Sequence, residues 1–157
     1  MSRAFVKESE SVDELPDRLI SDHPNYTTPN GLRLIQEALD TRHAALARAQ
    51  VIGDREAISS IVRDLRYWER RRATAIVVAP PTDTDHVRFG SVIIIKRAEG
   101  KRSYQIVGED EADPTQNTLS YVSPLAKALI GKAVGEALQI GDAQVELIGI
   151  ELPKSVD

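Results

Sequence analysis

Two heptad patterns that follow one another with only a short break constrain this chain more than any other feature of its sequence. In the first, apolar residues recur in steps of three, four, seven and three from Leu32 to Ala49. In the second, they recur in steps of three, four and three from Ile58 to Trp68. Such spacing places the apolar side chains along one side of an α-helix. Two helices joined by about four residues can bury both seams only by folding back on each other, so we predict an antiparallel helical hairpin, a short coiled coil, over residues 27–74.

Local signals set the ends of the two helices. Thr28 and Pro29 are typical of an N-cap and a first helical position. The run Val51–Gly53 interrupts the first pattern, and Asp54 can cap the second helix. At ~1.5 Å per residue, helices of about 20 residues form a hairpin roughly 30 Å long. Residues 1–26 mix Ser, Glu, Asp and Pro without a lasting period, which predicts an extended or partly ordered polar arm.

The second half of the chain changes from helical to extended patterns. Apolar runs bounded by turn residues predict five strands, at Ala75–Ala79, Ser91–Ile95, Ser103–Val107, Leu119–Val122 and Gln144–Leu152. A turn near Gly100 joins the second and third of these strands into a hairpin. Ser123 as N-cap, Pro124 at the first helical position and Gly131 as a left-handed stop predict one short helix. Strands with a single short helix indicate an α+β domain over residues 75–157, with a sheet that is antiparallel at least in the hairpin.

Composition narrows the classes of function. A charged fraction of 28% and a hydrophobic fraction of 41% are typical of a globular protein rather than a disordered one. The chain contains no cysteine, which excludes disulfides, thiolate metal ligands and cysteine nucleophiles. We expect a cytoplasmic protein without membrane contact, because neither a signal-peptide core nor an apolar stretch of membrane-spanning length is present. The net charge of −4 disfavours binding to free nucleic acid.

Several runs in the second half resemble the C-terminal domain of the Gre-type (GreA/GreB-like) bacterial transcription elongation factors. These runs are Val87–Ser91, the acidic stretch Tyr104–Asp113, the capped segment Ser123–Lys132 and the pair Val134-Gly135. The resemblance implies a helical hairpin followed by a small FKBP-like antiparallel β-sheet domain with one short helix. It also implies a regulator that binds RNA polymerase at the secondary channel, not an independent enzyme.

The resemblance points to two sets of site residues. In Gre-type factors the C-terminal domain docks on the rim of the channel through the loop before the short helix, which implies docking roles for Ser123 and Pro124; residue chemistry alone predicts only a helix start there. At the hairpin tip, the family carries two carboxylates that help hold a second magnesium ion in the polymerase active site. Asp54 matches the first of these acids. The second position holds Ala57, and Glu56 lies one residue earlier. Without the resemblance, both acids are explained by the start of a helix, where Asp54 can act as N-cap and Glu56 is favoured by the helix dipole.

The length of the hairpin bears on what the tip can do. Each arm looks shorter than the family pattern by about one to two heptads, or roughly 10 to 20 Å of reach. We therefore expect a protein that occupies the secondary channel and modulates elongation with weak or no stimulation of transcript cleavage. The alternative is a true cleavage factor that uses Asp54 and Glu56. No cofactor is expected beyond a magnesium ion shared with the polymerase, and contact with nascent RNA or DNA would be indirect.

A basic stripe lies on the second predicted helix. Arg63, Arg66 and Arg70 are spaced by three and four residues, which places them on one face, offset from the apolar seam. Such a stripe could contact RNA or an acidic wall of the channel. It could equally be a solvated face that pairs in part with Asp64 and Glu69.

Two further classes of protein remain open at this point. FKBP-like domains include peptidyl-prolyl isomerases, whose sites are walled by aromatic rings, and this half offers Phe89, Tyr104 and Tyr121. A coiled-coil adaptor would extend its seams into a dimer, whereas the leading interpretation expects a monomer. The acidic run Glu109–Asp113 lacks the ligand spacing of a calcium loop and predicts a solvated turn. The three histidines are scattered singly and predict no metal site.

Overall fold

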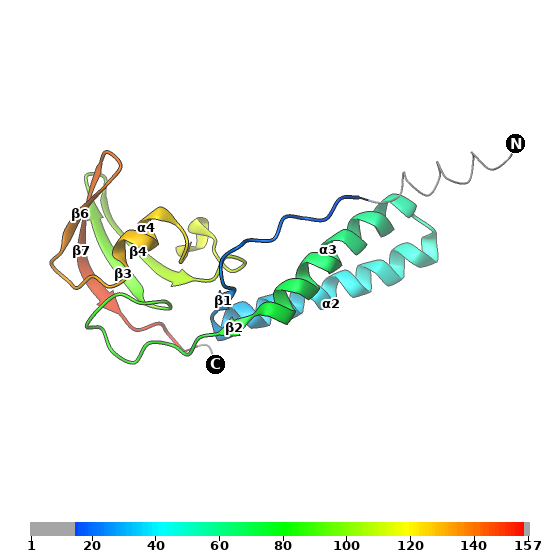
Figure 1. Ribbon diagram of the computed structural model, residues 1–157, viewed down its shortest axis with the longest axis horizontal. Helices are drawn as coiled ribbons and strands as arrows, with labels where there is room; N and C mark the ends of the chain where they lie inside the picture. Colours follow the sequence, from blue (N-terminus) through cyan, green and yellow to red (C-terminus); the bar gives the residue numbers. More distant parts are fainter. Residues whose placement is uncertain (1–14, 156–157) are drawn as a thin grey trace, which may run out of the picture. The chain divides into compact units, whose positions relative to one another are not determined.

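The computed structural model describes residues 15–155, which divide into two units (Figure 1). One unit contains the described chain up to Asp22 together with Leu34–Thr74, and the other contains His23–Arg33 together with the chain from Ala75 onward. The first is a helical pair with an extended segment, and the second is built on a five-stranded sheet. The predicted α+β class, with an N-terminal helical hairpin, is confirmed. No helix in this part of the chain has the length and apolarity to cross a membrane.

Helix α2 (Pro29–Ile52) and helix α3 (Arg55–Thr74) run in opposite directions and bury the two predicted seams (Figure 1). Ile35, Leu39 and Leu65 are at most 7% exposed. The link between the helices is tighter than the sequence pattern suggested, because α2 continues through Ile52 and leaves only Gly53 and Asp54 outside a helix. Helix α2 ends before Gly53, which adopts a φ of 79°, a conformation that residues with a side chain rarely adopt.

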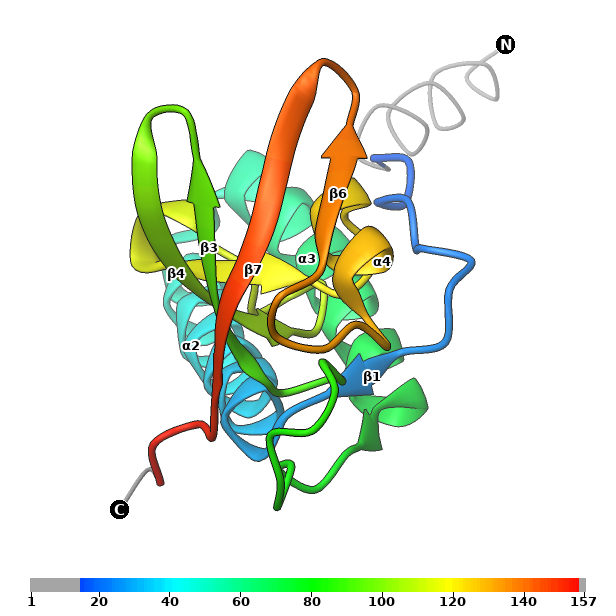
Figure 2. The same cartoon turned by 90° about the vertical axis from the view of Figure 1, so that its left-hand side faces the viewer.

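The second unit contains a five-stranded sheet in the order β5-β4-β3-β7-β6 (Figure 2). Its strands are β3 (Val92–Arg97), β4 (Gly100–Val107), β5 (Thr118–Ser120), β6 (Ala137–Ile140) and β7 (Ala143–Glu151). The sheet is mixed, since β5 pairs with β4 in parallel while the other pairs are antiparallel. This refines the predicted antiparallel sheet. The segment between β4 and β5, with the 3-10 turn η1 (Pro114–Gln116), brings the chain back to the level of Gln105 before β5 begins.

The core of this unit lies between the sheet and helix α4 (Pro124–Leu129), which is seen beside β6 in Figure 2. Ala126 and Leu129 of α4 are fully buried against alternate residues of the central strands, such as Ile93 and Leu147. Strand β6 was not predicted from the sequence. Its residues alternate between exposed and half-buried, so its apolar pattern is weak, and it is defined by pairing with β7.

Two short strands precede the sheet in the same unit. Strand β1 (Tyr26–Thr27) pairs in parallel with β2 (Ile76–Val77). The Ile76 amide donates to the Asn25 carbonyl at 2.8 Å, and the Val78 amide donates to the Thr27 carbonyl at 2.9 Å. Strand β2 is therefore shorter than the predicted run from 75 to 79. The predicted extended arm is seen only from Leu15, since its first 14 residues lie outside the described part.

Candidate functional site

The hairpin tip places its two acids in different local environments. Asp54 is the N-cap of α3, where its Oδ1 accepts the Ala57 amide at 3.1 Å and its carbonyl accepts the Ile58 amide at 3.0 Å. Glu56 lies in the exposed first turn of α3. On a helix, positions two residues apart point about 200° away from each other. The structure therefore does not pair the two carboxylates; one caps the helix and the other faces solvent near the positive end of the helix dipole.

The tip also carries two large aliphatic side chains, at the break in the first heptad pattern. Val51 is 89% exposed and Ile52 is 79% exposed, in the last turn of α2 beside Asp54. Side chains of this size normally lose most of their exposure in a folded domain. The end of the hairpin thus combines apolar and acidic groups, and both are accessible.

The acids of this chain do not form a metal site by themselves in the part that the structure describes. Within residues 15–155, no group of three or more His, Cys, Asp or Glu side chains is arranged to bind one. Magnesium prefers several oxygen ligands in octahedral geometry. Asp54 and Glu56 could add to a magnesium site only where most ligands come from another molecule.

The predicted docking residues lie at the start of α4. Ser123 Oγ accepts the Ala126 amide at 3.3 Å, with Pro124 at the first helical position, as predicted. Gly131 has a φ of 90° beyond the end of the helix. The Ser123 hydroxyl is half-buried and accepts as a cap, which leaves its O–H free to donate, and the Pro124 ring beside it is exposed.

A cluster of three aromatic rings forms around Tyr121, which lies close to this corner in the sequence. Tyr121, two residues before Ser123, meets Phe89 with ring centroids 5.5 Å apart and Tyr26 at the same distance. Its hydroxyl donates to the Pro24 carbonyl. These edge-on contacts stabilise the cluster and tie β1 to the domain. A prolyl isomerase needs aromatic rings that wall an open pocket. These three rings instead pack on one another.

The acidic run is more than the solvated turn that we predicted. Glu111 Oε2 accepts the Thr28 hydroxyl at 2.5 Å, and its Oε1 accepts the Asn30 side-chain amide at 2.8 Å. The Thr28 hydroxyl accepts the Gly31 amide in turn. A Cβ on Gly31 would lie 2.8 Å from Glu111 Oε2, so the lack of a side chain at Gly31 leaves room for this carboxylate. Sequence patterns do not predict this contact, because its partners are about 80 residues apart.

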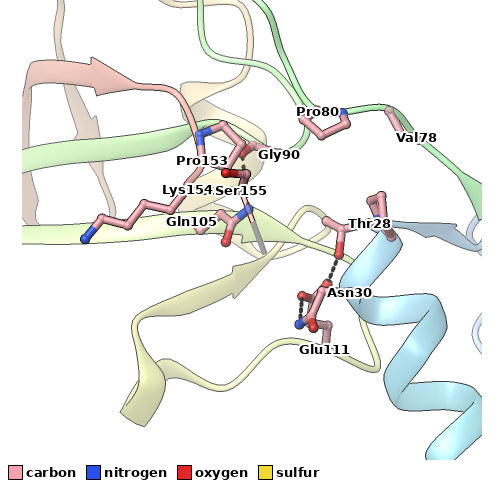
Figure 3. A pocket seen from close by; sticks show the side chains of 11 residues that line it. Thr28, Asn30, Val78, Pro80, Gly90, Gln105, Glu111, Pro153, Lys154 and Ser155 are labelled. Atoms are coloured by element: carbon pink, nitrogen blue, oxygen red, sulfur yellow. Dashed lines mark hydrogen bonds between the residues drawn. The ribbon is translucent and has the colours of Figure 1, made fainter. Parts of the chain in front are cut away.

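A cavity of about 360 Å³ lies next to this carboxylate in the second unit (Figure 3). Its wall is formed by the first turn of α2, the loops around β2 and β3, and the segment from Pro153 to Ser155. Glu111 is already held by Thr28 and Asn30, as the dashed lines in Figure 3 show. The wall contains no aromatic side chain, and on it the Gln105 side-chain amide donates to the Gly90 carbonyl at 3.4 Å.

The predicted basic stripe lies on α3 but is not uniformly available. Arg70 is exposed, while Arg63 is half-buried with its Nε 3.9 Å from Asp64. Arg66 Nε donates to Asp17 Oδ1 at 2.6 Å, a partner that lies 49 residues earlier. Of the partial pairing with Asp64 and Glu69 that the sequence allowed, the contact of Arg63 with Asp64 is found, whereas the contact of Arg66 with Asp17 was not predicted.

Comparison with known proteins identifies similar chains. Residues 81–151 match the family model described as "Transcription elongation factor, GreA/GreB, C-term". The chain is 37% identical over 94 residues to transcription elongation factor GreB of Haemophilus ducreyi, a match that covers 59% of this chain and 58% of that protein. It is 33% identical over 129 residues to transcription elongation factor GreA of Cereibacter sphaeroides, which covers 78% of this chain and 84% of the relative.

The extent of the matches differs between relatives. The chain spans 58% and 62% of the lengths of the GreB proteins of Haemophilus ducreyi and Neisseria meningitidis, less than two thirds of each. Among solved structures, GreA factor homolog 1 (Gfh1) of Thermus thermophilus aligns over 82% of this chain and 99% of its own, with 19% identity and a TM-score of 0.39.

Proposed function

Because the chain belongs to the GreA/GreB family of transcription elongation factors, we propose that it binds RNA polymerase and modulates transcript elongation. The C-terminal domain docks on the rim of the secondary channel, and the hairpin enters the channel. The observation that carries this proposal is the capped start of α4. It lies inside the matched segment and presents an exposed Pro124 with the Tyr121 ring close by in the chain.

The geometry of the tip supports a factor with weak or no stimulation of transcript cleavage. Delivery of a magnesium ion needs two carboxylates that converge on one point. Asp54 instead caps its own helix through the Ala57 amide, and Glu56 occupies a different face. The exposed Val51 and Ile52 suit a tip that rests against protein. In this proposal the protein is a regulator, and any catalytic chemistry belongs to the polymerase.

Transcript shortening in a backtracked elongation complex tests the proposal. A limiting amount of a genuine cleavage factor is present, and this protein is titrated in. We expect cleavage to fall, because the hairpin displaces the factor from the channel without replacing its chemistry. A rise in cleavage would instead support the alternative, in which Asp54 or Glu56 acts as a magnesium ligand, and it should then be abolished by Asp54→Asn with Glu56→Gln.

A matched pair of proline variants tests the docking corner in the same assay. Pro124→Ala should raise the concentration needed for inhibition by about three- to tenfold, since loss of one interface contact costs about 1 kcal/mol. Pro114→Ala is the control, because Pro114 also opens a short helix after an N-cap and is exposed. Equal behaviour of the two variants would remove Pro124 from the interface.

A further inference from the structure

The described end of the N-terminal arm lies along α3 within the helical unit (Figure 1). We call residues 15–18 the strap. Arg66 holds the strap at two points, because its Nε donates to Asp17 Oδ1 at 2.6 Å and its Nη2 donates to the Leu15 carbonyl at 3.4 Å. Arg18 Nη1 of the strap donates to Asp64 Oδ1 at 3.4 Å. The strap thus forms two ion pairs with α3. It contributes the acid to one of them and the base to the other.

The strap also covers aromatic surface on α3. The Arg18 guanidinium carbon lies 3.9 Å from the centroid of the Tyr67 ring and 5.8 Å from that of Trp68. The two rings meet edge to face at 5.1 Å, and Arg42 of α2 lies 5.4 Å from the centre of Trp68. Cations placed over aromatic faces at such distances are attracted by the ring quadrupole. The strap is therefore bound to a defined surface of α3.

We propose that the strap is an intramolecular competitor that covers part of the basic stripe and must leave α3 before an acidic surface of RNA polymerase can bind there. Asp17 occupies the position at which a carboxylate of the partner would meet Arg66. The partner is taken from the proposed function, and the inference rests on it to that extent. Arg63 and Arg70 flank the covered arginine on the same stripe, so a partner that binds all three has to displace Asp17.

The exposure of these contacts makes displacement feasible. The side chains of Arg66 and Asp17 are 44% and 71% exposed, and ion pairs at such sites contribute little to stability. A multivalent acidic partner therefore outcompetes the strap. If the strap occupies α3 for nine-tenths of the time, the apparent affinity of that partner is lowered about tenfold relative to the open state.

Trp68 allows the strap to be followed without any partner, because it is the only tryptophan of the chain. Acrylamide quenching of Trp68 fluorescence should increase in full-length Asp17→Asn and Arg18→Ala variants. Asp22→Asn is the control, since it removes the same charge from the same arm at an exposed position outside the strap. Unchanged quenching in both strap variants would show that the strap does not cover α3 in solution, and it would overturn the inference.

Binding to core RNA polymerase, free of nucleic acid, tests the competition itself. Asp17→Asn should bind about three- to tenfold more tightly than the wild type, and Asp22→Asn should match the wild type. Increased quenching with equal polymerase affinity would mean that a strap exists but does not compete, which rejects the inference and leaves the proposed function intact. A different outcome is that Asp17→Asn binds more tightly than the wild type only to polymerase complexes that carry RNA. That result would mean that the covered face binds RNA, and it would reject an acidic protein surface as its partner. Failure of every variant to bind polymerase would reject the proposed function and the competition with it, while the quenching result still reports on the strap.

Discussion

At the scale of single residues, Glu111 connects distant parts of the chain. Its carboxylate accepts from Thr28, just before the 24-residue helix α2, and from Asn30 in its first turn, so it supplies the negative charge that a helix N-terminus favours. Thr28 is only 7% exposed and depends on this partner. The acidic run therefore serves the second unit as a helix anchor.

Removal of this carboxylate should destabilise the second unit. We expect Glu111→Ala to lower the free energy of unfolding by about 1 to 3 kcal/mol, because two donors lose a charged acceptor. Glu111→Gln should cost less, since one oxygen acceptor remains. Urea unfolding followed by circular dichroism measures the effect. Glu99→Ala, at an exposed turn, should change stability by no more than about 0.5 kcal/mol, and an equal loss in both variants would contradict the anchoring role.

At the scale of the element, α3 combines several surfaces on one helix. Leu65 faces the seam, Arg70 faces solvent, and Arg66 and Tyr67 are contacted by the strap. A helix can separate these roles because residues three or four apart share a face and residues two apart do not. The stripe predicted from spacing is a real face of α3, but its accessibility depends on the arm.

Loss of the stripe should weaken binding to polymerase. Replacement of Arg63, Arg66 and Arg70 by Gln is expected to reduce affinity about tenfold at low salt, since each exposed ion pair contributes up to about 1 kcal/mol. The difference should shrink as salt is added. A variant with Gln at Lys96, Lys101 and Arg102, on the exposed β3–β4 hairpin, removes the same charge elsewhere. Unchanged binding of the stripe variant at low salt would contradict a role for these arginines.

At the scale of the whole molecule, the apolar seams are used within one chain. Ile35, Leu39 and Ala49 of α2 are at most 7% exposed, and Leu65 of α3 is 6% exposed. A coiled-coil adaptor would need these side chains at an interface between two copies. Within residues 15–155, their burial inside one hairpin leaves no continuous apolar seam for a second chain.

We therefore expect the protein to sediment as a monomer. Analytical ultracentrifugation over a hundredfold range of concentration should give a constant mass near the 17.3 kDa of one chain. Ile35→Asp is a useful companion variant, because Ile35 is buried within the hairpin. The substitution should unfold the hairpin, whereas in a coiled-coil adaptor it would separate two copies. A mass that doubles with concentration would favour the adaptor interpretation.

The sequence by itself determined the features that depend on neighbours within one or two helical turns. The heptad seams, the Asp54 and Ser123 caps and the stop at Gly131 all follow from hydrogen bonds and packing at short separations, and each is found where its pattern predicted. The mixed sheet, strand β6 and the pairing of β1 with β2 depended on strand partners that periodicity does not specify.

Only the tertiary structure decided which charged residues meet. Asp17 finds Arg66 and Glu111 finds Thr28 across 49 and 83 residues, where local propensity carries no information. From the sequence, an acid in a polar segment is predicted to be solvated, because a donor that is distant in the chain cannot be recognised there. No periodicity in the sequence indicates which groups a charged side chain will contact. The exposure of the basic stripe and the hydrogen bonds of the acidic run were therefore known only from the tertiary structure.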